Sequence, residues 1–194
     1  MSFIRSMLLI ILTALCYPMI LANSINSIPS SFSVENLSFK AGDRWSYENR
    51  SANTDLLNRT WVETVKSIKG RQINYGRVDT LYNGTIEPEI FESRTIGQDF
   101  FAFPLSVGKQ WSSPNKERKK VVGTINYRVL LAENVTIKAG SFDALKIAAN
   151  FSYKGKRYQQ IFWFSPAVKA PILVHYMDGS SVSQITELTS FDLK

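Results

Sequence analysis

The chain has 194 residues, of which 44% are hydrophobic and 12% aromatic, so it is long enough to bury the core of one domain. Its net charge of +7 is mild and no long Lys/Arg run occurs, which argues against a nucleic-acid partner; a solvated surface is expected, and attraction to anionic lipid headgroups or acidic polymers is the functional alternative. A single histidine and a single cysteine exclude multi-histidine metal sites and cysteine-based zinc sites, so we expect neither a metal nor a cofactor.

Residues 1–22 have the features of a signal peptide. A positive charge at Arg5 precedes the apolar run Met7–Leu15, and Ala22 provides a cleavage site. An uncleaved anchor is disfavoured because Pro18 interrupts a run that is shorter than the ~20 residues of a membrane-spanning helix.

Cys16 allows a second interpretation of this segment, as a lipoprotein signal. The residue before an acylated cysteine is normally small and Leu15 is not, so cleavage without lipidation is preferred. We therefore expect a periplasmic or secreted protein with no transmembrane helix after signal removal.

Residues 23–38 are rich in Ser and Asn and predict a flexible linker, which is followed by a single β-rich domain over residues 39–194. The first half of this domain predicts four strands, because short apolar and aromatic runs alternate with turn signals. These strands cover residues 44–48, 60–68, 71–81 and 86–94, with hairpin turns at Lys69-Gly70 and Asn83-Gly84, and with a bulge at Gly76. The acidic residues in 86–94 predict an edge strand.

The second half predicts six further strands. A short one begins at Trp111; the others cover residues 121–131 with a continuation at 135–137, then 145–153, 157–164, 172–176 and 182–193, with tight turns at Lys154-Gly155 and Asp178-Gly179. The sequence Glu117-Arg118-Lys119-Lys120 predicts a basic hairpin tip rather than a binding patch.

A four-residue motif occurs twice. Gly42-Asp43-Arg44-Trp45 is echoed by Gly108-Lys109-Gln110-Trp111, and in both places a turn leads into a predicted strand. The echo suggests a repeated turn-strand device, although four residues are weak evidence for a duplication.

No segment has a sustained apolar stripe with a period of 3.6 residues, so the fold class is all-β. The short turns predict a single strongly curved antiparallel sheet or open barrel of about ten strands in meander order. A sheet of that many strands must curl to hide its apolar face.

Two groups of titratable residues could support catalysis, and a structural role is preferred for both. His175 lies in an apolar strand, and the chain has no nucleophile-elbow motif. Glu87, Glu89 and Glu92 could supply the paired carboxylates of a glycosidase, but a charged edge that blocks strand addition is the preferred explanation. We therefore expect that the protein is not an enzyme.

The aromatic residues are the candidate binding residues. Most should be core, but a curved sheet can leave its concave face partly unfilled, and the same side chains would then line a pocket for an acyl chain or another apolar ligand. The candidates are Trp45, Tyr47, Trp61, Phe101, Phe103, Trp111, Phe162 and Trp163.

The order of motifs from residue 39 to residue 193 resembles a family of uncharacterised exported bacterial domains called TapB-like or domains of unknown function. The resemblance rests on residues 42–47, 103–111, 135–147, 158–165 and 187–191, while residues 167–171 depart from the family pattern. It implies no catalytic residues. By architecture such domains are similar to periplasmic lipoprotein carriers of the LolA/LolB type, whose curved sheets hold acyl chains.

The leading hypothesis is an exported, non-enzymatic binding module of the envelope that holds an apolar or lipid-like ligand in its curved sheet. The alternative is an interaction or assembly protein with a fully packed core, whose protein partner docks on its surface or at a sheet edge.

Overall fold

A computed structural model of the chain describes residue 28 and residues 32–95, 102–117, 120–153 and 155–194. The predicted signal peptide and much of the predicted linker lie outside the described residues. No helix in the described ranges is long and apolar enough to cross a membrane.

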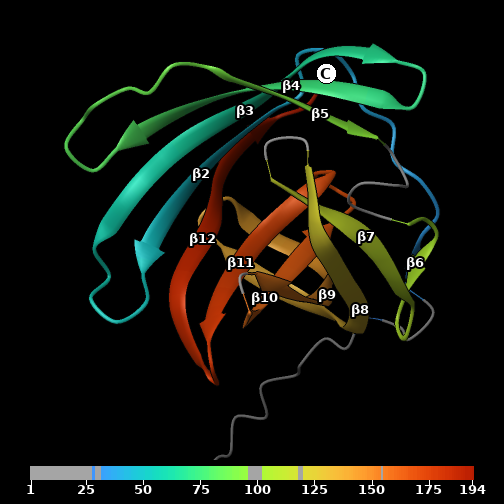
Figure 1. The fold of residues 1–194 in the computed structure, drawn as a ribbon. Helices are drawn as coiled ribbons and strands as arrows, with labels where there is room; N and C mark the ends of the chain where they lie inside the picture. Colours follow the sequence, from blue (N-terminus) through green and yellow to red (C-terminus); the bar gives the residue numbers. More distant parts are fainter. Residues whose placement is uncertain (1–27, 29–31, 96–101, 118–119, 154) are drawn as a thin grey trace, which may run out of the picture.

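Twelve strands are described and no helix occurs among them. They are β1 (Ser33–Val34), β2 (Arg44–Ser51), β3 (Leu57–Lys69), β4 (Gln72–Leu81), β5 (Ile90–Thr95), β6 (Leu105–Ser106), β7 (Gln110–Glu117), β8 (Lys120–Ile137), β9 (Gly140–Tyr153), β10 (Lys156–Ser165), β11 (Ala170–Asp178) and β12 (Ser181–Asp192). Ten of them form one antiparallel sheet in the order β5-β4-β3-β2-β12-β11-β10-β9-β8-β7 (Figure 1).

The sheet consists of two meanders that meet in the middle. β2 to β5 extend it in one direction, and β12 back to β7 extend it in the other, so that β2 and β12 form the only strand pair between the two halves. The predicted all-β fold with ten antiparallel strands in meander order is therefore confirmed. β5 and β7 are the two edges, and the sheet is not closed into a barrel.

One turn folds back over the face of the sheet. The backbone N–H of Lys138, between β8 and β9, donates a hydrogen bond of 2.6 Å to the Glu187 carboxylate on β12, and the Lys138 ammonium contacts Glu48 on β2. These contacts bridge strands that are several positions apart in the sheet order.

The predicted linker over residues 23–38 contains an ordered strand. Ser33 pairs with Ser106 and Val34 pairs with Leu105, so β1 and β6 form a separate two-stranded sheet. Val34 is 4% exposed and packs in the core. The boundary at residue 38 is thus too late, because a polar neighbourhood hides a single buried valine from composition alone.

The repeated turn-strand device is present. The Gly42 N–H donates to the Val65 carbonyl at 2.9 Å, and the Val65 N–H returns a bond to the Asp43 carbonyl at 2.8 Å. In the second copy, the Gly108 N–H donates to the Val129 carbonyl at 3.0 Å, and the Val129 N–H returns a bond to the Lys109 carbonyl at 2.9 Å.

The two copies agree beyond these bonds. Gly42 and Gly108 have φ values of +94° and +88°, which favour glycine. In each copy the partner strand that carries the bonded valine, β3 or β8, has a register shift directly after it, between Val65 and Ser67 and between Val129 and Leu131. The short sequence echo therefore marks the same local structure twice.

Gly76 is not itself a bulge. The register shift lies on the neighbouring strand β3, and Gly76 stays paired with Thr64. A Cβ at Gly76 would collide with the side chains of Lys66 and Glu89, which form an ion pair of 2.7 Å over it. The glycine makes room for that pair.

Candidate functional site

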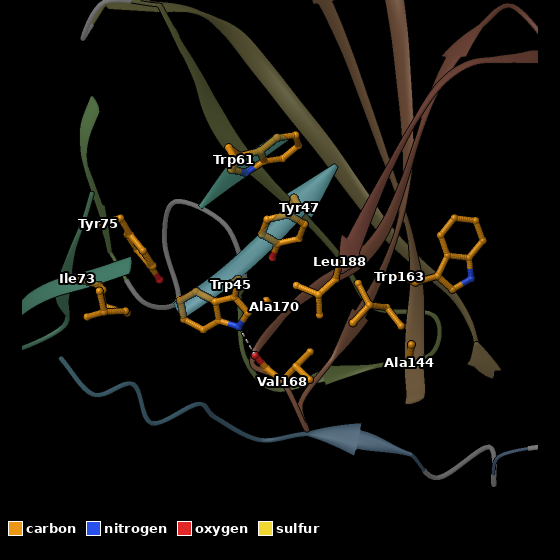
Figure 2. Packing of buried hydrophobic residues seen from close by; sticks show 12 residues of the cluster. Trp45, Tyr47, Trp61, Ile73, Tyr75, Ala144, Trp163, Val168, Ala170 and Leu188 are labelled. Atoms are coloured by element: carbon orange, nitrogen blue, oxygen red, sulfur yellow. Dashed lines mark hydrogen bonds between the residues drawn. The ribbon is translucent and has the colours of Figure 1, made fainter. Parts of the chain in front are cut away.

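Trp45, Tyr47 and Trp61 pack in a first core cluster between the two halves of the sheet (Figure 2). They are 2%, 6% and 7% exposed. The Trp45 indole N–H donates to the Val168 carbonyl at 2.7 Å, and Tyr47 stacks on Trp61 with ring centroids 5.2 Å apart. Nine further buried residues of the cluster, among them Leu188, fill the space around them. These three aromatic residues stabilise the core.

Two arginines cover the outer face of Trp61. The guanidinium carbons of Arg77 and Arg59 lie 4.5 Å and 5.2 Å from its ring centroid, within the range of a cation–π contact. Both arginines form ion pairs with the Asp79 carboxylate, Arg77 at 2.5 Å and Arg59 at 3.3 Å. The charge pairs close this side of the cluster to solvent.

Phe162, Trp111 and Phe103 belong to a second core cluster in the other half of the sheet. Phe162 is 4% exposed, and Trp111 stacks on Tyr127 at 4.8 Å. β1 and β6 supply buried residues to the same cluster, so these short strands cover it. Phe101 lies outside the described residues.

Trp163 points to the opposite sheet face from Phe162, its neighbour in sequence, as strand alternation requires. Its indole N–H donates a hydrogen bond of 2.6 Å to the Glu133 carboxylate, and the Lys146 ammonium lies 4.8 Å from its ring centroid. The His175 ring packs against it in a T-shaped arrangement, with the two ring centroids 4.8 Å apart. Burial, and then the nearby Lys146 ammonium, lower the pKa of His175, which favours the neutral imidazole. Among the described residues, His175 makes no hydrogen bond to a side chain that could act as a nucleophile, and its ring packs against Trp163.

The predicted binding set is therefore divided between two packed clusters. Two surface grooves exist elsewhere, at the sheet end where β9 finishes and β10 begins, and none of the predicted residues lines either of them. The larger, which we call the end groove, has a volume of about 590 Å³. It is lined by Val122, Gly123, Thr124, Asn126, Asn150, Phe151, Ser152, Arg157, Tyr158, Gln159, Met177 and Gly179.

The end groove has a polar floor that the sequence analysis did not identify. Register places Asn126, Asn150 and Gln159 in one row across β8, β9 and β10. The Gln159 amide donates to the Asn150 side-chain oxygen at 2.9 Å. The signal was present in the sequence as a period-2 pattern, but only strand pairing brings the three amides together.

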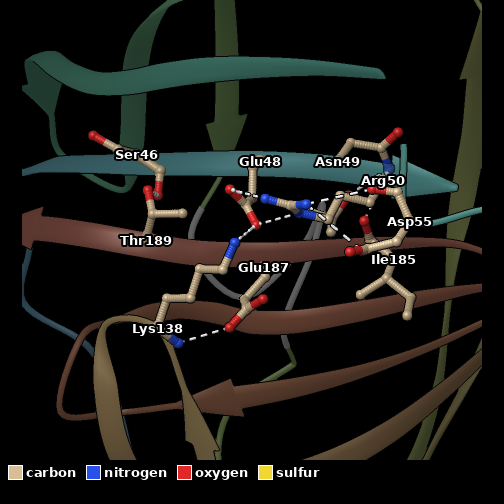
Figure 3. Close-up of polar contacts among 10 residues, drawn as sticks. Ser46, Glu48, Asn49, Arg50, Asp55, Lys138, Ile185, Glu187 and Thr189 are labelled. Atoms are coloured by element: carbon tan, nitrogen blue, oxygen red, sulfur yellow. Dashed lines mark hydrogen bonds and ion pairs between the residues drawn. The ribbon is translucent and has the colours of Figure 1, made fainter. Parts of the chain in front are cut away.

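A second polar group ties β2 to the β8–β9 turn (Figure 3). Glu48 is 8% exposed and accepts hydrogen bonds of 2.7 Å and 3.2 Å from Arg50. The bonds from Arg50, together with Lys138, hold the pKa of the Glu48 carboxyl below its usual value despite burial. This carboxylate is engaged in structural contacts.

Several large apolar side chains face solvent in the edge strand β5 and in the residues that precede it. We call the stretch from residue 82 to residue 91 the edge segment. Within it Tyr82, Ile86, Ile90 and Phe91 are 79%, 69%, 48% and 71% exposed. β5 pairs with β4 on one side and with no described strand on the other. The predicted edge position of this segment is confirmed.

Glu89 and Glu92, two of the three glutamates that could have formed an acid/base pair, are each ion-paired in the described structure. Glu89 binds Lys66 at 2.7 Å and Glu92 binds Arg94 at 2.8 Å. Each carboxylate is held by a cation of its own, which fits the charged-edge interpretation.

No protein-family model and no curated protein matches the chain. Solved structures do match. A lipoprotein candidate from Parabacteroides distasonis is 15% identical, with a TM-score of 0.58 over 82% of this chain and 100% of that one. An exported-protein candidate from Bacteroides fragilis, described as having a YmcC-like fold, is 11% identical, with a TM-score of 0.55 over 81% of this chain and 99% of that one.

At such low identity these structures show that the fold is shared and nothing about function. Neither is described as TapB-like or as a LolA/LolB-type carrier, so those two resemblances stay predictions.

Proposed function

We propose that the chain is an exported, non-enzymatic interaction module of the cell envelope that binds a protein partner by adding a strand to the edge of β5. The predicted signal peptide supports export, as does the description of the two structural relatives as lipoprotein or exported candidates.

One observation supports the interaction role: the candidate aromatic residues are mostly buried, whereas the backbone of the edge strand β5 has no described partner on one side. Trp45, Trp61 and Phe162 are each at most 7% exposed, so they offer no surface to an acyl chain. Phe91, in contrast, is 71% exposed on a strand whose second backbone edge has no described partner. The packing therefore favours the interaction module over a lipid carrier.

The chemistry of an edge strand suits a protein partner. Unpaired backbone N–H and C=O groups are satisfied by another strand, and exposed side chains on alternate positions add specificity. Glu87, Pro88 and Glu89 just before β5 discourage unspecific pairing, because charge and proline are the usual protection of a sheet edge.

Site-specific photo-crosslinking tests the proposal. A photoreactive phenylalanine analogue replaces Phe91 in one version of the protein and Ser112, an exposed position on the opposite edge strand β7, in the control version. Both are exported in cells and irradiated. We expect one discrete protein adduct from position 91 and none from position 112; no adduct at 91, or equal adducts at both, would contradict strand addition at β5.

Native mass spectrometry of the same purified protein separates the two roles. An interaction module should carry no lipid after mild purification and should not take up a fluorescent fatty acid. A stoichiometric bound lipid would restore the carrier hypothesis.

A further inference from the structure

One end of the sheet is poor in acidic residues, although Glu117 pairs with Lys120 in the β7–β8 hairpin and Asp178 lines a groove together with Lys156 and Arg157. From Ala144 to Met177 the sequence contains no Asp or Glu, and the same holds from Lys120 to Ala132. These ranges cover the first part of β8, most of β9 and all of β10. The strand ends at residues 120–125, 150–153 and 156–158 are neighbours, because Phe151 pairs with both Ile125 and Tyr158.

Three cations at this end have no ion-pair partner among the described residues. Lys120, Lys156 and Arg157 are exposed, and we call them the basic end. Elsewhere in the described chain the arginines of the sheet are mostly neutralised: Arg50 binds Glu48, and Arg77 binds Asp79. The basic end is thus a positive surface that no ion pair of the described residues neutralises.

Apolar side chains project beside these cations. Val121 is 65% exposed and Val122 is 41% exposed, directly after Lys120. Tyr158 is 39% exposed, directly after Arg157. Val122 and Arg157 also line the end groove, so the cations, the apolar side chains and the amide row belong to one surface.

We propose that the basic end docks on the surface of an anionic phospholipid bilayer. The three cations lie at the level of the phosphates, and Val121 and Val122 enter the interfacial region, as in other peripheral proteins that combine basic and apolar side chains. The sequence alone favours a solvated hairpin tip. The exposed valines decide for a bilayer over a soluble polyanion, since they gain nothing from a nucleic acid or an acidic polysaccharide.

The bilayer surface is separate from the edge segment. β5 is one edge of the sheet, while the basic end belongs to strands near the opposite edge. A protein on the membrane through β8–β10 would keep β5 accessible, and each of the two proposals can fail without the other.

Vesicle co-sedimentation tests the proposal with the exported protein, purified after processing. One set of vesicles contains equal parts of phosphatidylglycerol and phosphatidylcholine, and the other contains phosphatidylcholine alone. We expect binding to the anionic vesicles only, weakening as salt is raised. Equal binding to both sets would overturn the proposal.

A charge-matched pair of variants locates the surface. The triple change Lys120→Gln, Lys156→Gln and Arg157→Gln should weaken binding by roughly 100-fold, because each cation near an anionic surface contributes about a fivefold factor. The control changes Lys40→Gln, Arg44→Gln and Lys69→Gln remove the same charge from exposed positions at the other end of the strands. The control should bind like the parent; an equal loss in both would show that net charge alone acts and would overturn the proposal.

The valines separate a bilayer from a polyanion. The double change Val121→Ser and Val122→Ser should weaken binding to anionic vesicles by roughly tenfold, since apolar area no longer leaves water. Retention on a heparin column should stay unchanged. If the double variant bound both the vesicles and the heparin column as the parent does, the surface would be an unspecific polyanion site instead. All substituted positions are exposed, and circular dichroism checks that each variant is folded.

Discussion

The two copies of the turn-strand device share a backbone and differ in what their side chains hold. In the first copy the residue after the glycine is Asp43, which is fully buried and accepts hydrogen bonds of 2.9 Å from the backbone N–H groups of Lys40 and Lys194 and from the Lys169 ammonium. In the second copy it is Lys109, whose ammonium donates to the Pro104 carbonyl at the surface.

The tryptophans at the end of each motif differ in the same way. The Trp45 indole N–H binds the Val168 carbonyl, whereas the buried Trp111 indole N–H has no hydrogen-bond partner in the described part of the chain. The glycine and the valine on the partner strand are thus sufficient for the backbone conformation that the two turns share. The other positions decide whether the turn also ties distant segments together.

Replacing the tryptophans should give the largest difference between the copies. Trp45→Ala should lower the free energy of unfolding by about 3–5 kcal/mol, because a large, fully packed side chain is lost. Trp111→Ala should cost clearly less, since Trp111 is only partly buried and loses no hydrogen bond. Urea unfolding followed by fluorescence measures both. Equal losses would mean that the two copies are anchored alike.

Asp43→Ala should lower the free energy of unfolding by about 3 kcal/mol at neutral pH, because it leaves the buried Lys169 ammonium without its carboxylate. Burial alone would raise the pKa of Asp43, but the N–H groups of Lys194 and Lys40 and the Lys169 ammonium lower it below the ordinary 3.8. The stabilisation is therefore complete above pH 3.8 and is lost as the pH falls through the lower folded pKa. The gap between parent and variant should shrink in acid; a gap independent of pH would contradict the role of the carboxylate.

The glycines give a smaller and graded effect. Gly42→Ala and Gly108→Ala should each cost about 1–2 kcal/mol, since φ is strongly positive at both positions. Gly42→Ala should be the worse of the two, because its Cβ would lie 3.2 Å from Lys194 Cγ, whereas nothing lies within 4 Å at Gly108. Thermal unfolding ranks them, and the reverse order would show that the backbone of the two turns is not equivalent.

Lys109→Ala should have the smallest effect, within about 0.5 kcal/mol, as expected for a surface side chain with one carbonyl contact. It is the direct counterpart of Asp43→Ala in the second copy. A loss comparable to that of Asp43→Ala would show that Lys109 anchors its turn as well.

Local signals predicted most of the strands. The hairpin turns predicted at Lys69-Gly70 and Asp178-Gly179 lie one residue later, at Gly70-Arg71 and Gly179-Ser180, with positive φ at each glycine, and the strands on either side pair as adjacent sequence implies. The four-residue echo at Gly42 and Gly108 also carried real structural information, because a glycine conformation and a strand start are both local properties.

Features that depend on distant partners could not be predicted. Nothing local indicates that β2 pairs with β12, or that Val34 finds a buried place beside Leu105. Alternation shows which side chains share a face of the sheet, but it does not show what covers that face. From the sequence, Trp61 and Phe162 are therefore candidate pocket residues. In the structure, Arg77 covers Trp61, and the short strands β1 and β6 cover the cluster that contains Phe162.

The positions of neighbouring charges also depend partly on the three-dimensional structure. Arg77 has Asp79 two residues later on the same strand face, whereas no acidic residue lies within two positions of Arg157 in the sequence. Strand pairing brings the cations of the basic end together, and the sequence alone does not show that they are neighbours.

The β2–β12 pair also sets a condition on biosynthesis. Asn49 and Thr186 face each other across this pair although they are 137 positions apart, so the two meanders cannot join until almost all of the chain has emerged. Until then the growing protein exposes Trp45 and Tyr47 on an unfinished sheet, which slows folding and invites aggregation. A chain with this order of strands can complete its sheet only when its last strand is available.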